Sequence, residues 1–101
     1  MKEKKILVKL RGKKYSLKGK ELSGFEQFFG LMFKKKEKAE ILIFKMKKPK
    51  KIKIHSFFVF FPFIAIFLNS RKEVVDIKVI KPFKFFFSSK KAKFLIEIPI
   101  K

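Results

Sequence analysis

Three side chains in this sequence of 101 residues could carry acid–base chemistry: His55, Asp76 and Glu97. His55 is the single histidine, and imidazole is the side chain that ordinarily titrates near neutral pH. A catalytic base also needs a nucleophile or an orienting carboxylate beside it, and the two acids stand in apolar segments otherwise flanked by lysine. These residues are therefore the candidates for a hydrolase-like enzyme. A paired-carboxylate glycosidase would need both acids on one cleft.

A structural interpretation of the same residues stays open. His55 alternates with Ile52 and Ile54, so we expect it on the less buried face of a strand, where it is structural or simply exposed. Each acid can instead pair with a cross-strand lysine or a backbone group. The sequence leaves undecided whether the protein is an enzyme.

The sequence contains few residues that could bind a metal or a cofactor. The absence of cysteine excludes disulfides, thiolate zinc sites and cysteine nucleophiles, and one histidine is few for a metal site. The four glycines fit no phosphate-cradling spacing. We expect neither a metal nor a cofactor.

The net charge of +20 has two interpretations. Of 28 basic residues only Arg11 and Arg71 are arginine, so 28 − 2 = 26 are lysine, which lacks the bidentate fork that nucleic-acid readers favour. Lysine, isoleucine and phenylalanine also share A/T-rich codons, so a low-GC genome would enrich all three without selection for function. Alternatively, the surface lysines bind polyanions, either nucleic acid or an anionic membrane.

Phenylalanines 83 and 85–87 stand beside Lys81 and Lys84. Such a cluster can stack bases while the lysines hold phosphates, or can dip into an anionic bilayer surface. It can equally belong to the core. The Gly-Phe pattern of an RNA-recognition sheet is absent.

The elements that must position these residues are mainly strands, built around the uncharged run from Phe57 to Leu68. Its 12 residues fall short of the roughly 20 that a membrane-spanning helix needs. Pro62 has no N–H for a sheet ladder, so we predict two buried strands, one ending near Phe60 and one over Phe63–Leu68. The second is expected to form a hairpin with residues 73–80.

Residues 4–17 are predicted to form an N-terminal hairpin with Gly12 in its turn, and Lys18–Lys20 a second break. Ser23 and Glu26 make a capping-box pattern that predicts a short helix over about residues 23–31. Further strands are predicted over 40–46, 51–55 and 93–98, with a loop over 47–51 held open by Pro49. Residues 85–87 remain ambiguous.

The order of several short motifs resembles a numbered family of domains of unknown function, number 192 in that series. The matching segments are Gly-Leu-Met-Phe at 30–33, Ile-His-Ser-Phe-Phe-Val-Phe-Phe-Pro at 54–62, Lys-Pro-Phe at 81–83 and Ala-Lys-Phe-Leu-Ile-Glu-Ile-Pro at 92–99. The resemblance extends from about Ser23 to Pro99. It implies a compact, mainly antiparallel β sandwich or half-barrel with one short helix, and it implies no reaction.

Three positions depart from the family pattern. Gln27 stands where the family commonly has arginine, Ile64 where it commonly has aspartate, and Ser56 where methionine is usual. If that arginine and aspartate form a polar pair or line a site in relatives, this protein has lost both partners. Any activity of the family would then be in doubt here.

We therefore expect one domain over residues 1–101, mainly β, as an antiparallel sandwich or half-barrel with one short helix near residues 23–31. The leading functional hypothesis is a non-enzymatic binding or accessory protein that is cytoplasmic and monomeric or weakly associating. We expect no export signal, because the N-terminal apolar run covers only Ile6–Val8. The alternatives are a basic protein that binds nucleic acid or an anionic membrane surface, and a hydrolase-like enzyme that uses His55.

Overall fold

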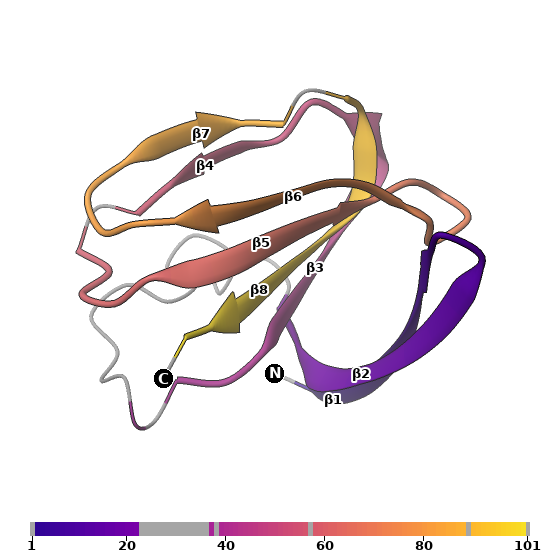
Figure 1. The fold of residues 1–101 in the computed structure, drawn as a ribbon, viewed down its shortest axis with the longest axis horizontal. Coiled ribbons are helices and arrows are strands. Elements are labelled where there is room, and N and C mark those ends of the chain that lie inside the picture. Colours follow the sequence, from indigo (N-terminus) through magenta and orange to yellow (C-terminus); the bar gives the residue numbers. More distant parts are fainter. Residues whose placement is uncertain (1, 23–36, 38, 57, 89, 101) are drawn as a thin grey trace.

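The computed structural model describes residues 2–22, 37, 39–56, 58–88 and 90–100, which form two sheets (Figure 1). The predicted helix near residues 23–31 lies outside the described residues. The eight strands are β1 (Lys2–Leu10), β2 (Lys13–Leu22), β3 (Leu42–Lys50), β4 (Lys53–His55), β5 (Phe63–Leu68), β6 (Val74–Ile80), β7 (Phe85–Phe87) and β8 (Ala92–Pro99). The fold is thus mainly β, as the sequence predicts.

The larger sheet has six strands in the order β1-β2-β3-β8-β5-β6, and β4 and β7 pair as a separate two-stranded ribbon. All strand pairs are antiparallel except β2–β3, which is parallel, so the fold is mainly antiparallel as expected. The sheet curls until its edge strands meet, where the Lys9 N–H donates to the Lys72 carbonyl at 2.9 Å. This curl makes the half-barrel seen in Figure 1.

Strand alternation sorts the apolar residues onto the two faces of this sheet. On one face, Leu22, Phe44, Leu95 and Phe67 form a row of cross-strand partners, and the apolar residues of the β4–β7 ribbon pack against them. On the other face Ile43 and Ile96 pack with residues of β1 beneath the curled hairpin. The central strand β8 is therefore covered on both sides.

The N-terminal hairpin has the predicted turn, with positive φ at Arg11 and Gly12. The predicted break at Lys18–Lys20 is wrong, because β2 runs straight through Gly19. A Cβ at Gly19 would lie 2.6 Å from the carbonyl oxygen of Ile41. This glycine lets the incoming chain approach β2 closely, and the Lys20 N–H bonds the same carbonyl at 2.8 Å.

Two further predictions need correction. The expected loop over 47–51 is mostly strand, because β3 continues to Lys50 across an irregular register that accommodates Pro49. The expected strand ending near Phe60 stops at His55, and residues 58–62 lie outside the strands, with Phe58 and Phe60 exposed and Val59 and Phe61 buried. By contrast, the break at Pro62 and the β5–β6 hairpin are confirmed, and residues 85–87 form β7.

Candidate functional site

The three candidate acid–base residues lie on three different strands. His55 ends β4 in the ribbon, where its backbone pairs with Phe85, whereas Asp76 and Glu97 lie on β6 and β8 of the six-stranded sheet. The strand β5 separates the two acids, and Asp76 is level with Leu95, two residues from Glu97, so their backbones lie about 12 Å apart. Within the described part of the chain, no three His, Asp or Glu side chains gather as metal ligands.

Glu97 is the acid with the most unusual environment. Its cross-strand neighbours are Leu42 on β3 and Ala65 on β5, and only 7% of the residue is exposed. Burial disfavours the charged form and raises the pKa of the Glu97 carboxyl to about 8. This glutamate is therefore mostly a neutral carboxylic acid at pH 7, which suits a core position.

A buried network of hydrogen bonds surrounds Ser56, directly after β4. The serine is fully buried, and its hydroxyl donates to the Lys81 carbonyl at 2.5 Å and accepts from the Lys84 N–H at 2.6 Å. Its own N–H donates to the Lys84 carbonyl, and its carbonyl accepts from the Phe83 N–H, both at 2.8 Å. Ser56 thereby joins the end of the segment after β4 to the turn 81–84.

A second buried serine closes the other end of the ribbon. The Ile52 N–H donates to the Ser88 hydroxyl, and the Ser88 N–H donates to the Ile52 carbonyl, both at 2.8 Å. The Ser88 hydroxyl in turn donates to the Lys90 carbonyl at 2.9 Å. The short β4–β7 ribbon is thus held at both ends by serine side chains. This explains how two strands of three residues each keep a defined position.

Three phenylalanines project from the end that Ser56 organises, and we call Phe58, Phe60 and Phe83 the aromatic tip. Their exposed fractions are 47%, 60% and 50%. The Phe83 ring packs edge to face with Phe58 and Phe60, at centroid distances of 6.2 and 5.9 Å. The three rings therefore present one apolar surface to solvent.

Two residues of the aromatic tip, Phe58 and Phe83, have a strained backbone conformation. Phe58 has φ 61° and Phe83 has φ 59°, a left-handed conformation that costs a bulky residue about 1–2 kcal/mol. The bonds from Ser56 hold both the loop and the turn in place against this cost. Strain retained beside exposed aromatic side chains points to a functional surface.

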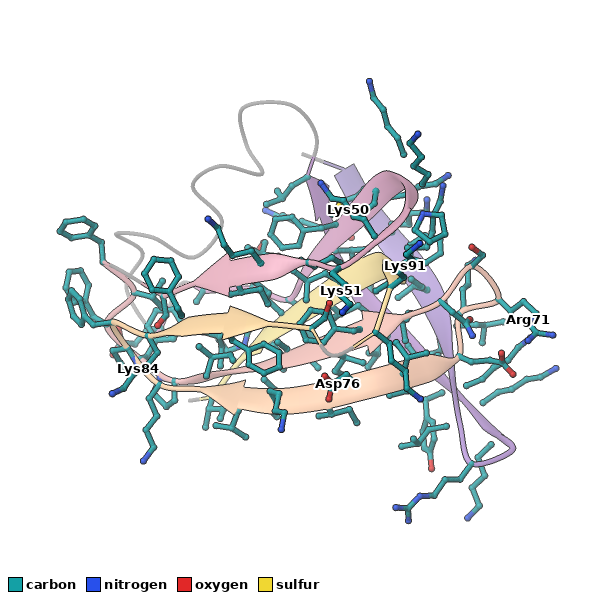
Figure 2. All side chains as sticks on the ribbon, turned by 90° about the horizontal axis from the view of Figure 1, so that it is seen from above. Lys50, Lys51, Arg71, Asp76, Lys84 and Lys91 are labelled. Atoms are coloured by element: carbon teal, nitrogen blue, oxygen red, sulfur yellow. The ribbon has the colours of Figure 1, made fainter. Side chains whose placement is uncertain are left out.

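Lysines surround the tip and continue along the ribbon. Lys81 and Lys84 are exposed on either side of Phe83, and the Lys53 ammonium lies 6.0 Å from the Phe85 ring centroid. Farther along is a lysine patch, where Lys50, Lys51 and Lys91 lie close together in Figure 2 and the Lys50–Ala92 pairing joins the two chain segments. The patch comprises Lys47, Lys48, Lys50, Lys51, Lys53, Lys90, Lys91 and Lys93.

The chain segments that supply these lysines contain no acid. No aspartate or glutamate occurs in residues 41–72 or 77–96, which supply both the tip and the patch. Three ion pairs of the described residues lie at β1, β2 and the segment before β3, through Glu3, Glu21 and Glu40, and another joins Arg71 to Glu73 in the β5–β6 turn. The segments that form the tip and the patch therefore supply positive charge without an acid of their own.

Sequence reasoning identified part of this surface. The cluster at Phe83–Phe87 with Lys81 and Lys84 was a candidate, and the structure exposes Phe83 and Phe85 while Phe86 is half-buried. The sequence places Phe58 and Phe60 in a buried strand, and this prediction is wrong. One residue could have indicated an exposed loop here, namely Ser56, which is polar where the family pattern has methionine.

The fold and this surface define the class as a small, mainly β half-barrel with a basic, aromatic-tipped ribbon. The chain belongs to the family DUF192, described as an uncharacterized ACR, which matches residues 21–100. It is 36% identical over 74 residues to a UPF0127 protein of Pyrococcus furiosus, a match that covers 73% of this chain and 64% of the relative. A UPF0127 protein of Thermococcus sibiricus is 35% identical over 77 residues, covering 75% and 50%. The match thus spans half to two-thirds of these relatives.

Two solved structures share the fold. A Sinorhizobium meliloti protein, described as a "putative transcription regulator", superposes with a TM-score of 0.79 at 15% identity, over 96% of this chain and 79% of that one. A protein of unknown function from Novosphingobium aromaticivorans gives a TM-score of 0.75 at 19% identity, over 96% and 73%. At these identities the likeness concerns the fold alone.

In the described residues, no helix is long and apolar enough to cross a membrane.

Proposed function

We propose that this protein is a non-enzymatic binding protein that docks on an anionic lipid surface through the aromatic tip. The rings of Phe58, Phe60 and Phe83 enter the interface, and Lys81 and Lys84 contact headgroup phosphates. The observation that carries this proposal is the exposed apolar tip with lysines on both sides and no acid in the segments that form it.

The expected energies are adequate for reversible docking. Completing the burial of three half-exposed phenyl rings contributes about 1 kcal/mol each, half of the value for a fully exposed side chain. Each lysine close to an anionic leaflet contributes about 1 kcal/mol more. Neither contribution suffices alone after the cost of association, so binding should require both the rings and the charge.

A lipid surface fits this geometry better than a single-stranded nucleic acid. Base stacking uses open ring faces arranged in series, whereas these rings pack edge to face into one projecting group. The tip also lies on two loops and not on a flat strand surface. Arginine, the side chain best suited to bidentate phosphate recognition, is missing from the tip and the patch.

The proposal extends to location and assembly. Cytoplasmic leaflets carry the anionic lipids of most membranes, so we place the protein in the cytoplasm, as a monomer that associates with the membrane from that side. Support for a non-catalytic role comes from the arrangement of the candidates, since His55 belongs to the ribbon and Asp76 and Glu97 belong to the other sheet.

The test is sedimentation with phosphatidylcholine vesicles that contain or lack phosphatidylglycerol. The double variant Phe58→Asn/Phe60→Ser should lose most binding to the anionic vesicles. The matched control Leu7→Ser/Tyr15→Ser removes apolar side chains of similar exposure, 49% and 48%, from the N-terminal hairpin, and should bind like the unmodified protein. Equal loss in both variants would contradict the proposal.

A second pair of variants tests the charge. Lys81→Gln/Lys84→Gln should weaken vesicle binding and reduce its salt dependence, whereas Lys5→Gln/Lys13→Gln, with the same change in net charge, should have a much smaller effect. A single-stranded oligonucleotide is the competing ligand. If the tip variant lost oligonucleotide binding while vesicle binding was absent in the unmodified protein, the surface would belong to a nucleic-acid binder.

A further inference from the structure

A second site lies at the other end of the molecule, where the turn of the N-terminal hairpin faces the turn between β5 and β6. The two turns are held together by the bond from the Lys9 N–H to the Lys72 carbonyl, and Lys9 and Glu73 form a parallel bridge. Between them is a cleft of about 400 Å³ with Val74 and Val75 among its lining residues. Its size is in the range of small-ligand sites.

Three cations line this cleft: Lys9, Arg11 and Lys14. Lys9 and Lys14 are direct cross-strand partners in the hairpin, an arrangement of like charges that destabilises a sheet unless something neutralises it. Among the described residues, none of the ion pairs engages any of the three. An anion placed between them would relieve this repulsion.

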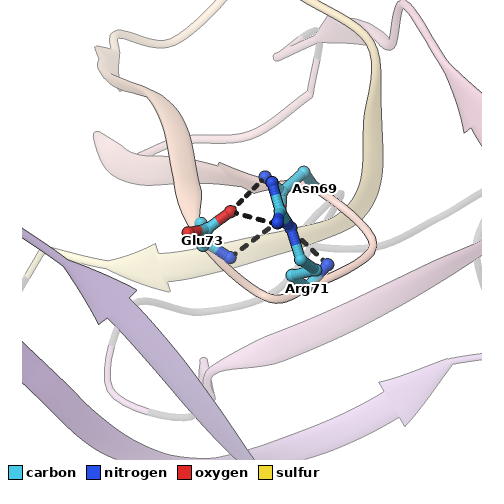
Figure 3. Close-up of polar contacts among 3 residues, drawn as sticks. All are labelled: Asn69, Arg71 and Glu73. Atoms are coloured by element: carbon cyan, nitrogen blue, oxygen red, sulfur yellow. Dashed lines mark hydrogen bonds and ion pairs between the residues drawn. The ribbon is translucent and has the colours of Figure 1, made fainter. Parts of the chain in front are cut away.

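The one acid in the cleft is already engaged. Figure 3 shows Glu73 with Asn69 and Arg71: its carboxylate accepts from the Asn69 side-chain amide at 2.9 Å and lies 3.3 Å from Arg71 Nε. The side-chain oxygen Oδ1 of Asn69 in turn accepts from the backbone N–H groups of Arg71 and Glu73 at 2.9 and 3.0 Å. The bond from Asn69, aided by Arg71, lowers the pKa of Glu73, which keeps it ionised. The wall is therefore ordered, and its negative charge is shared between Arg71, which pairs with it, and Lys9, whose charge acts on it more weakly; Arg11 and Lys14 have no such counter-charge among the ion pairs of the described residues.

Of the 28 basic residues only two are arginine, and one of them, Arg11, lines this cleft. The other, Arg71, is not part of the lining but pairs with Glu73, which is. Guanidinium binds tetrahedral oxyanions through two parallel N–H donors, which an ammonium cannot do.

We propose that this cleft binds the phosphate group of a small phosphorylated molecule, with Arg11 as the bidentate donor and Lys9 and Lys14 as flanking charges. Asn69, Arg71 and Glu73 form the supporting wall. The site is independent of the lipid-docking surface, because Arg71 and Lys84 lie at opposite ends of the molecule (Figure 2).

The test is an amide ¹⁵N NMR titration of the full chain with inorganic pyrophosphate, compared with sodium acetate at the same ionic strength. Pyrophosphate should give saturable shifts in residues 9–14 and 69–75. Arg11→Gln/Lys14→Gln should weaken the apparent affinity about tenfold or more, while the control Lys90→Gln/Lys91→Gln, equal in charge, should leave it unchanged. Arg11→Lys, which keeps the charge, should recover only part of the loss.

Three results would overturn the assignment: shifts spread over the lysine patch, equal weakening by the control variant, or an equal response to acetate. Well-dispersed spectra of each variant verify folding, and all four substituted side chains are exposed. Because vesicle sedimentation reports on the other end of the molecule, failure of one proposal leaves the other intact.

Discussion

Because Glu97 is buried, we expect the unfolding free energy of this protein to depend on pH. Its carboxyl is placed between Leu42 and Ala65 in the centre of the sheet, and burial raises its pKa from the ordinary 4.5 to about 8. The folded state therefore holds this proton more tightly than the unfolded chain does. The stabilisation of the folded state is complete below pH 4.5 and is lost as the pH rises towards about 8.

The magnitude follows from the two pKa values of Glu97. A difference between 4.5 and about 8, at about 1.36 kcal/mol per pH unit, corresponds to about 5 kcal/mol of unfolding free energy. This is a large part of the stability of an ordinary small protein. The substitution Glu97→Gln keeps the shape and stays neutral, so it should remove this component and make the protein more stable at alkaline pH.

Urea unfolding followed by circular dichroism, in buffers on both sides of this pH range, measures the effect. The unmodified protein and Glu97→Gln should be similarly stable in acid and should diverge progressively above pH 4.5. The exposed Glu37, changed to glutamine, is the control and should follow the unmodified protein. Parallel stability curves for Glu97→Gln and the unmodified protein would refute the assignment of a neutral buried acid.

Two further predictions concern the construction of the fold. Ser56→Ala removes the hydroxyl that bonds two part-buried backbone groups, the Lys81 carbonyl and the Lys84 N–H, and should lower the unfolding free energy by about 1 kcal/mol and weaken vesicle binding. Ser70→Ala, at an exposed turn position, should do neither in the same assays. Gly19→Ala places a Cβ 2.6 Å from the Ile41 carbonyl oxygen and should cost about 1–3 kcal/mol in urea unfolding. Gly12→Asn is the control, because Gly12 has open space around it and asparagine tolerates positive φ, and it should cost less unfolding free energy than Gly19→Ala. Equal costs at both glycines would refute the argument that Gly19 is needed for the close approach of Ile41.

Much of the fold follows from local patterns. The hairpin turn at Gly12 needs positive φ, and Pro62 cannot donate to a ladder, so both boundaries are visible in the chain. The alternation in residues 94–98 is equally local, because side chains on a strand point to opposite faces in turn. These features depend on neighbouring residues only, and all of them are confirmed.

The errors share one physical origin, which is contact between distant segments. Gly19 looks like a break until Ile41 packs against it, and Phe58 looks like core until Ser56 ties its loop to the turn 81–84. A hydrophobic run indicates that burial is favourable, but it does not show whether a partner surface reaches every residue of the run. That is why two residues of the uncharged run, Phe58 and Phe60, are exposed at the tip while Val59 and Phe61 between and after them are buried.

The sequence by itself determined the mainly β class, the family, the excess of lysine and the identities of the titratable residues. Only the tertiary structure decided what surrounds them. Strand order places β8 at the centre and thereby buries Glu97 between apolar neighbours, and the curl of the sheet brings Lys9, Arg11 and the β5–β6 turn to one cleft. Composition and periodicity are properties of the chain, whereas the environment of a charge depends on which strands become neighbours.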